Sequence, residues 1–387
     1  MNDRAPWRRR SFGTVALAAI LALAACKSRG PGAESKTEIK IGATLPLTGS
    51  EARIGGFYKE GYDLAVEQAN AGGGLEVGGK RLPVRFTLLD DTSTQATAVS
   101  LADRLVNGDK VDFLLGTYAS HLVEAQSTVA EQNKVPYVNG GGGATQIYRR
   151  GYKYLFGLLA PVELLGSTLM QWIDGEQQAG RLPKPSRIAL VWENTAHGKD
   201  FRRGVQEFAQ QRQGAYPIVV DESFELDGKD FGALLGKVKA SGADLFLVDA
   251  LGPDNVLYVL SAVWWSPQLA ERQGGLAKDF VEVFKAKYGG RTPEWYQALG
   301  YETARALFTA IQQAGKVDRE AVRAKLAEMK IPSLLPGGQL SFAADHGQQA
   351  YYPFVVQQNL PGGRSPLVFP KEVALAEGVA PNPRCAK

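Results

Sequence analysis

Short apolar runs alternate with segments of helical periodicity along most of the chain. In the first half, the pattern predicts strands at 39–43, 82–90, 111–115 and 135–138, and helices at 56–70, 96–107 and 122–132. Strands that alternate with helices in this way are typical of a parallel sheet with helices on its faces.

A second cycle of the same kind begins near residue 154. The pattern predicts strands at 155–158, 187–192, 216–221 and 245–248, and helices at 164–172, 198–211, 231–240 and from 254 to 260. It then predicts helices at 276–288, 301–314 and 319–329, and a terminal hairpin made of 339–342 and 352–357. The chain has 387 residues, more than the roughly 250–300 at which a single core stops growing. We therefore predict an α/β protein with two Rossmann-like lobes, each built on a parallel sheet, around a central cleft.

The first 25 residues differ from the rest of the chain. Three arginines at 8–10 precede a small and apolar run at 11–25, which is shorter than the roughly 20 residues of a membrane-spanning helix and typical of a signal peptide. The run ends in Leu-Ala-Ala-Cys, the pattern of a bacterial lipobox. It predicts that Cys26 receives a lipid, although a chance cysteine after an ordinary cleavage site is the alternative. Residues 26–36 are predicted to be the flexible tether of a lipoprotein anchored at the periplasmic, or extracytoplasmic, face of a membrane.

Charge and motifs argue against several classes of function. Residues 1–25 carry four arginines and one aspartate, so their removal lowers the formal net charge from +4 to +1, which is too little for nucleic-acid binding. The chain has no G-x-S-x-G motif and no paired His–Ser pattern, so we do not expect an enzyme. The four glycines at 140–143 fit neither nucleotide-binding pattern. Three scattered histidines and a second cysteine, Cys385, give no metal-ligand spacing and no internal disulfide, and we expect neither a metal nor a cofactor.

Several segments, in their order and spacing, resemble those of one known family. They are 41–49 (IGATLPLTG), Gly55, 61–65 (GYDLA), 89–91 (LDD), 115–116 (LG), 135–137 (VPY) and 296–306 (YQALGYETARA). They resemble type 1 periplasmic binding proteins, and in particular the leucine/isoleucine/valine-binding proteins of branched-chain amino-acid ABC importers. The likeness extends over about 37–370.

The resemblance implies an organisation and a partner. Lobe 1 would hold 37–157 and 270–335, lobe 2 would hold 158–269 and 336–370, and 371–387 would form a C-terminal tail. Three chain crossings would join the lobes, which would close on a solute by hinge motion. The protein would be a monomer that delivers its solute to the permease subunits of an ABC transporter.

Two loops after predicted strands are candidates for binding a solute carboxylate. Ligands of open α/β sheets bind at the carboxyl ends of strands, where helix N-termini present free N–H groups. The resemblance implies that Ser120 and Thr145 hold the carboxylate together with backbone groups at Gly143, in the loop that also contains Ala144. The alternative is that the two hydroxyls only cap the following helices.

Other candidates lie around the same expected cleft. His197 occupies a position where the family usually has an aromatic residue that covers the ligand, although it could also be a surface histidine. Asp249 follows the strand at 245–248 and could accept from a solute ammonium or cap the strand end. Trp295 and Tyr296 fall where the family often has an aromatic residue in the cleft, and core packing is the alternative for Tyr296. Tyr118, Tyr58 and Arg53 are weaker candidates for the same cleft.

One region departs from the family pattern. The stretch 260–267 leads almost directly into the segment before the next lobe crossing, so about 40–50 family positions are missing and the second lobe is predicted to be shortened. This leaves ammonium recognition and solute identity open. A branched-chain amino acid is favoured, aromatic acids and amides are alternatives, and a ligand sensor on the same fold is an alternative to transport.

Overall fold

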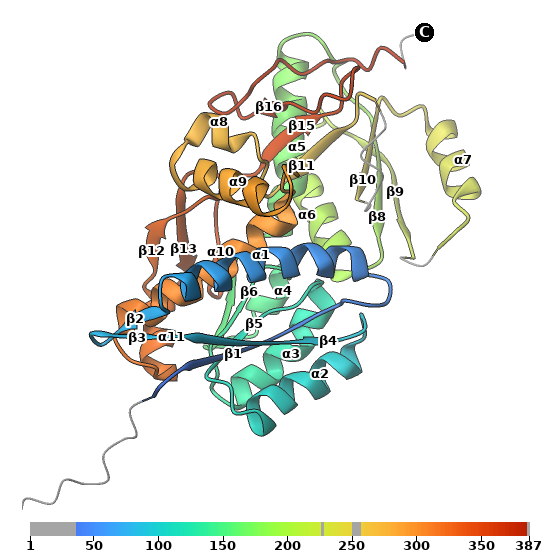
Figure 1. Cartoon of the computed structure of the whole chain (residues 1–387). Helices are drawn as coiled ribbons and strands as arrows, with labels where there is room; N and C mark the ends of the chain where they lie inside the picture. Colours follow the sequence, from blue (N-terminus) through green and yellow to red (C-terminus); the bar gives the residue numbers. More distant parts are fainter. Residues whose placement is uncertain (1–35, 226–227, 250–256, 385–387) are drawn as a thin grey trace, which may run out of the picture. The chain divides into compact units, whose positions relative to one another are not determined.

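The computed structural model describes residues 36–225, 228–249 and 257–384 (Figure 1). The predicted signal peptide, the predicted lipidation site Cys26, nearly all of the tether, and Cys385 lie outside the described residues. The described residues from 38 onward form one compact unit. Within the described part, no helix combines the length and the apolarity that crossing a membrane requires.

The larger sheet has eight strands in the order β12-β13-β14-β7-β6-β5-β1-β4. The strands from β14 to β4 pair in parallel, and β12, β13 and β14 pair antiparallel at the other edge. Their bounds are β1 (Ile39–Leu45), β4 (Val84–Asp90), β5 (Phe113–Leu115), β6 (Tyr137–Asn139), β7 (Leu155–Gly157), β12 (Lys330–Pro332), β13 (Gln339–Ala343) and β14 (Gln349–Ala350).

Helices cover both faces of this sheet because its central strands are apolar on both sides. In β5, the consecutive residues Phe113, Leu114 and Leu115, whose side chains alternate between the two faces, are all buried. On one face α1 packs along α10, and the two helices run side by side in Figure 1. The helices that accompany the sheet are α1 (Ala52–Ala71), α2 (Gln95–Asp103) with a π turn at Arg104–Gly108, α3 (Ser120–Gln132), α4 (Thr145–Tyr148), α10 (Trp295–Ala314) and α11 (Arg319–Ala327). A small hairpin, β2 (Leu75–Val77) and β3 (Lys80–Leu82), joins α1 to β4.

The second parallel sheet has three strands in the order β10-β8-β9. Its strands are β8 (Ile188–Glu193), β9 (Ile218–Phe224) and β10 (Leu245–Asp249), and the helices of this part are α5 (Val162–Gln178), α6 (Ala196–Gln211) and α7 (Gly232–Ser241). The edge strand β10 exposes 48% of Phe246 and 44% of Val248, and α7 buries none of its residues. This part is therefore smaller and less covered than the first sheet.

Three features differ from the predictions. Leu260 begins a strand, β11 (Leu260–Val263), so the helix predicted to extend to this residue is wrong there; residues 254–256 lie outside the described part. β11 forms a third sheet with β15 (Val355–Gln358) and β16 (Leu367–Phe369), and α8 (Leu269–Gln273) and α9 (Gly275–Lys287) follow it. The predicted terminal hairpin is wrong because β13 and β15 lie in different sheets.

The third difference concerns the boundary expected at residue 336. β13 and β14, which are joined by a 3-10 turn at Ala344–His346, pair into the larger sheet, with β14 beside β7. Residues 339–350 thus belong with the sheet of the first lobe and not with the second. The other lobe boundaries stay predictions.

A glycine contact sets the distance between α5 and α6. A β-carbon at Gly204 would collide with the carbonyl oxygen of Glu163 on α5. We expect Gly204→Ala to lower the free energy of unfolding by about 1–3 kcal/mol, the usual range for overpacking of a close contact. Urea denaturation measures the effect. Gly175→Ala, where a β-carbon meets no atom within 4 Å, is the matched control, and equal stability of the two variants would contradict the prediction.

Candidate functional site

The two loops predicted to bind a carboxylate lie next to each other. The loop after β5 ends at Ser120, the first residue of α3, and the loop after β6 ends at Thr145, the first residue of α4. Tyr118 and Gly141 form a bridge between the loops, and the Ser120 hydroxyl oxygen accepts from the N–H of Ala144 at 3.3 Å. The N-cap residues of the two helices are alanines without a side-chain hydrogen bond, so neither hydroxyl serves as the helix cap.

The donors of Thr145 bind carboxylates from α5 and α6. Its N–H donates to Asp200 at 2.8 Å, and its hydroxyl donates to Glu163. Arg203 contacts both carboxylates, and Arg149 lies 3.7 Å from Glu163. The positions expected to hold a solute carboxylate are thus occupied by the protein's own carboxylates. Sequence reasoning did not identify Asp200 or Glu163, because nothing in their local pattern points to a loop in the other half of the chain.

A glutamine side chain holds the glycine-rich loop in place by hydrogen bonds. Gly143 and Ala144 are buried, and the Gly143 carbonyl accepts from the side-chain amide of Gln349 at 3.0 Å. The same amide nitrogen donates to the carbonyl of Leu159 at 2.9 Å. Gln349 on β14 therefore holds the loop in place. The sequence did not predict this role, because the family resemblance places residues 336–370 in the other lobe.

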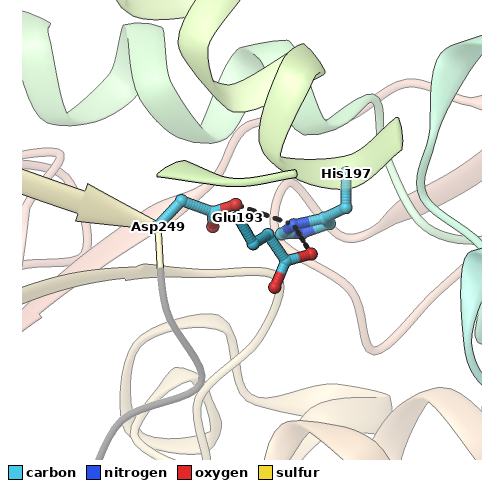
Figure 2. Close-up of side chains that lie close together, drawn as sticks. All are labelled: Glu193, His197 and Asp249. Carbon is cyan, nitrogen blue, oxygen red and sulfur yellow. Dashed lines mark hydrogen bonds and ion pairs between the residues drawn. The ribbon is translucent and has the colours of Figure 1, made fainter. Parts of the chain in front are cut away.

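A second group of polar residues lies at the ends of β8 and β10 (Figure 2). We call Glu193, His197 and Asp249 the strand-end cluster. Because β8 and β10 are neighbours in parallel, Glu193 and Asp249 end at the same edge, and His197 lies in the first turn of α6. The Nδ1 atom of His197 is 3.1 Å from Asp249 Oδ2 and 3.6 Å from Glu193 Oε1. Thr195 caps α6 and donates its hydroxyl to Glu193 Oε1 at 2.5 Å.

Negative charge dominates the surroundings of the strand-end cluster. Burial by itself lowers the pKa of His197, but Asp249, Glu193 and Asp200 outweigh it and raise that pKa to about 9. Burial and the charge of Asp249 raise the pKa of Glu193 against the opposing effect of His197. Burial and the charge of Glu193 likewise raise the pKa of Glu51, the N-cap residue of α1. Carboxylates thus outnumber cations here, which favours the binding of a further cation.

A row of aromatic rings connects the first loop to the strand-end cluster. Its ring centroids are separated by 6.0 Å from Tyr118 to Tyr296, 3.7 Å from Tyr296 to Trp295, 5.0 Å from Trp295 to Trp264 and 6.2 Å from Trp264 to His197. Of these side chains Trp295 is half-buried, whereas Tyr118, Tyr296 and Trp264 are buried. The predicted aromatic residues Tyr118, Tyr296 and Trp295 therefore lie together. The structure adds Trp264, which was not selected from the sequence although Trp264 and Trp265 form a noticeable tryptophan pair.

The weaker candidates lie farther from this row or behind it. Tyr58 is fully buried, stacks on Tyr118 at 5.6 Å and donates to the Gly140 carbonyl at 2.5 Å. Arg53 is exposed and pairs with Glu294 at 3.7 Å. A cavity of about 520 Å³ lies between α5 and α6, and one of about 290 Å³ lies beside α1 and α10, and no predicted binding residue lines either one.

Comparisons with known proteins agree with this architecture. The profile of the family described as periplasmic binding protein matches residues 38–259 and 246–363. The Leu/Ile/Val-binding protein homolog 7 of Brucella abortus is 23% identical over 397 residues, which cover 92% of this chain and 98% of the relative. Among solved structures, a leucine binding protein, LivK, from Thermotoga maritima has a TM-score of 0.72 at 22% identity, covering 85% of this chain and 97% of the other.

A further solved structure carries an aromatic acid. It is a solute binding protein of an ABC transporter from R. palustris in complex with benzoate, with a TM-score of 0.72 at 20% identity over 89% of this chain and 99% of the other. The family profile spans most of the chain, and the relatives are solute-binding proteins and not enzymes. The chain therefore belongs to the periplasmic binding protein family that its sequence pattern predicted.

Proposed function

We propose that this protein is the lipid-anchored solute-binding component of an ABC importer and captures a small amino-acid-like solute through its positively charged amino group. The observation that carries the proposal is the strand-end cluster, where two buried carboxylates lie beside a row of aromatic rings. A branched-chain amino acid is the leading candidate, because the relatives named above include Leu/Ile/Val-binding and leucine binding proteins.

Capture would exchange one set of carboxylates for another. In the proposal, the solute ammonium binds between Glu193 and Asp249, and its carboxylate takes over the N–H and hydroxyl of Thr145 from Asp200 and Glu163. The displaced carboxylates would keep Arg203 as their partner, so no buried charge would be left without one. The two halves of the site come from different sheets, so binding at both would stabilise a closed arrangement.

A panel of solutes tests the proposal. Leucine, isoleucine, valine, aromatic acids, amides and simple amines are added to the purified protein, and thermal shift and calorimetry report binding. A solute present at 100 times its Kd should stabilise the native state by about 2.7 kcal/mol. Failure of every amino acid and amine to shift the melting temperature would overturn the proposal. The benzoate complex of the R. palustris protein and the aromatic row favour a second candidate, an aromatic acid, which the same panel includes.

Removing the two hydroxyls tests the carboxylate half of the site. We expect Ser120→Ala with Thr145→Ala to weaken the binding of carboxylate solutes by roughly 10- to 100-fold, because a hydrogen bond to a charged group contributes about 1.5–3 kcal/mol. Binding of solutes without a carboxylate should be unchanged. Thr309→Ala, which removes a hydroxyl that bonds only to its own helix, is the control. Calorimetry measures affinity, and equal carboxylate affinity in the double variant and the control would remove these residues from the site.

The lipid anchor has its own test. We expect Cys26→Ser to move the exported protein from the membrane fraction to the soluble fraction, because the thiol that would carry the lipid is lost. Cys385→Ser is the matched control and should leave the protein in the membrane fraction. Fractionation with mass spectrometry of the N-terminal peptide measures both, and a Cys26→Ser protein that still sediments with membranes would contradict the lipoprotein assignment.

A further inference from the structure

The strand-end cluster brings three different ligand-type groups to one point. Glu193, His197 and Asp249 each offer one donor atom, and the three atoms lie within 4.8 Å of one another (Figure 2). Glu193 and Asp249 are each only 7% exposed, whereas His197 is half-buried. No local spacing predicts this group, because 52 residues separate His197 from Asp249.

A proton on His197 cannot serve both carboxylates. Nδ1 carries at most one hydrogen, and Asp249 at 3.1 Å is within its reach, whereas Glu193 at 3.6 Å is beyond hydrogen-bond distance. Glu193 takes its hydrogen bond from Thr195 instead. A divalent ion placed among the three atoms would displace the Nδ1 proton of His197, which would leave to solvent, and would contact both carboxylates and the ring nitrogen at once. Its two charges would then balance those of the two carboxylates beside a neutral imidazole.

The distances suit a small first-row ion. Nitrogen and oxygen donors bind Zn²⁺ at about 2.0–2.2 Å, so two donors at a tetrahedral angle lie roughly 3.3–3.6 Å apart. The two separations from Nδ1, 3.1 Å and 3.6 Å, are close to that range before any ion binds. The three donor atoms lie within 4.8 Å of one another, so the two carboxylates would move closer together when all three donors bind one ion.

The backbone around the cluster is also held in place. β8 and β10 are hydrogen-bonded neighbours, which fixes the positions of Glu193 and Asp249 relative to each other. A β-carbon at Gly198 would collide with the carbonyl oxygen of Glu193, so the glycine lets the first turn of α6 lie directly against the end of β8. This close approach places His197 over the two carboxylates.

We propose that Glu193, His197 and Asp249 form a binding site for a divalent transition-metal ion of the Zn²⁺ or Mn²⁺ kind. Two carboxylates and one imidazole are a donor set that such ions accept, and three protein ligands leave at least one coordination position open. A solute carboxylate can fill that position, so a bound ion would give the site a second way to hold an anion while Thr145 is occupied by Asp200 and Glu163. The inference does not depend on the proposed amino-acid solute, whose ammonium would compete with the ion for the same carboxylates.

Titration with the metal alone tests the inference. The purified protein is stripped with EDTA, dialysed, and titrated with ZnCl₂ or MnCl₂ by calorimetry, and Co²⁺ absorbance reports the ligand geometry. We expect one ion per chain. Replacing even an outer-shell partner of a metal typically costs 10- to 100-fold in affinity, so losing two ligands in Glu193→Gln with Asp249→Asn should weaken binding by at least about 100-fold. The control is Glu222→Gln, an exposed carboxylate of β9 that pairs with Lys237.

The possible results separate this inference from the proposed function. No binding to the wild-type protein, or equal affinity in the wild-type protein, the double variant and a His197→Gln variant, would overturn the metal site. The wild-type titration decides this even if a variant fails to fold. The solute panel repeated in EDTA reports on the proposed function alone, because solute binding without metal upholds the transport proposal whatever the metal titration shows.

Discussion

Glu193→Gln combined with Asp249→Asn is expected to weaken the binding of ammonium-bearing solutes by at least about 100-fold in the presence of EDTA. Each hydrogen bond to a charged group contributes about 1.5–3 kcal/mol, and 1.4 kcal/mol corresponds to a tenfold change in Kd. Both substitutions keep the size of the side chain and remove its charge, so the effect is electrostatic. Calorimetry with the tightest-binding amine or amino acid of the panel measures the change.

The matched control for this prediction is again Glu222→Gln. It removes one negative charge from the neighbouring strand β9, where the side chain is exposed and paired with Lys237. Water and salt screen such a charge, so we expect an affinity within about twofold of the wild-type value. If the double variant bound the solute as tightly as this control, the ammonium would have to bind elsewhere, and the strand-end cluster would lose its place in the proposed function.

Most of the strands of the first half could be predicted because the local pattern of apolar residues indicates which side chains are buried. The run 39–43 alternates buried Ile39, Ile41 and Ala43 along one face and lies inside β1, and the helix predicted at 56–70 lies inside α1. The ends of elements were less accurate: α1 begins at Ala52 because the chain turns into the helix directly after Glu51. Existence and type of an element depend on local pattern, whereas its ends depend on contacts that the pattern does not contain.

Which strands pair was harder to predict than where they lie. Residues 339–342 and part of 352–357 are strands, as predicted, but β13 pairs with β12 and β14, and β15 pairs with β11 and β16. A short strand with alternating apolar residues can pair with any open sheet edge, so its pattern does not identify its partner. The predicted hairpin joined two runs that were close in sequence, and the fold separates them between two sheets.

The candidate site shows the same limit. Single residues such as His197 and Asp249 could be selected because they follow strands, but their meeting at one point required the pairing of β8 with β10. The contact of Thr145 with Asp200 spans 55 residues and two sheets. Burial of a charged side chain becomes interpretable only once its partners are known, so the acidic character of the site could not be predicted from sequence.

The second parallel sheet exposes apolar side chains at its edge strand β10 and on the helix α7. In the described residues β10 is an edge strand, and Phe246, Val248 and Leu235 of α7 are each more than 40% exposed. A sheet face of this kind is normally covered by a further strand or helix. The loss of 40–50 family positions that the sequence pattern predicts after residue 260 would account for these apolar side chains in solvent.

Arg305→Met is expected to lower the free energy of unfolding by about 3–5 kcal/mol, the usual cost of leaving a buried charge without its partner. Glu302 on α10 is fully buried, and Arg305 donates to both of its carboxylate oxygens at 2.7 Å. Arg305 also donates to the Pro332 carbonyl, and the Ser333 hydroxyl donates to Glu302 at 2.5 Å. The pair therefore joins α10 to the edge of the larger sheet. Urea denaturation of the purified protein measures the change.

An exposed pair with the same sequence spacing separates burial from charge. Arg323 and Glu320 on α11 are also three residues apart and 3.0 Å from each other, but the Glu320 side chain is 58% exposed. Arg323→Met should therefore cost less than about 1 kcal/mol, as surface ion pairs do. Adding Glu302→Gln to Arg305→Met should restore part of the lost stability, because the unpaired charge is then removed as well. Equal destabilisation by Arg305→Met and Arg323→Met, with no recovery in the double variant, would mean that Arg305 acts through packing of its stem and not through the buried carboxylate.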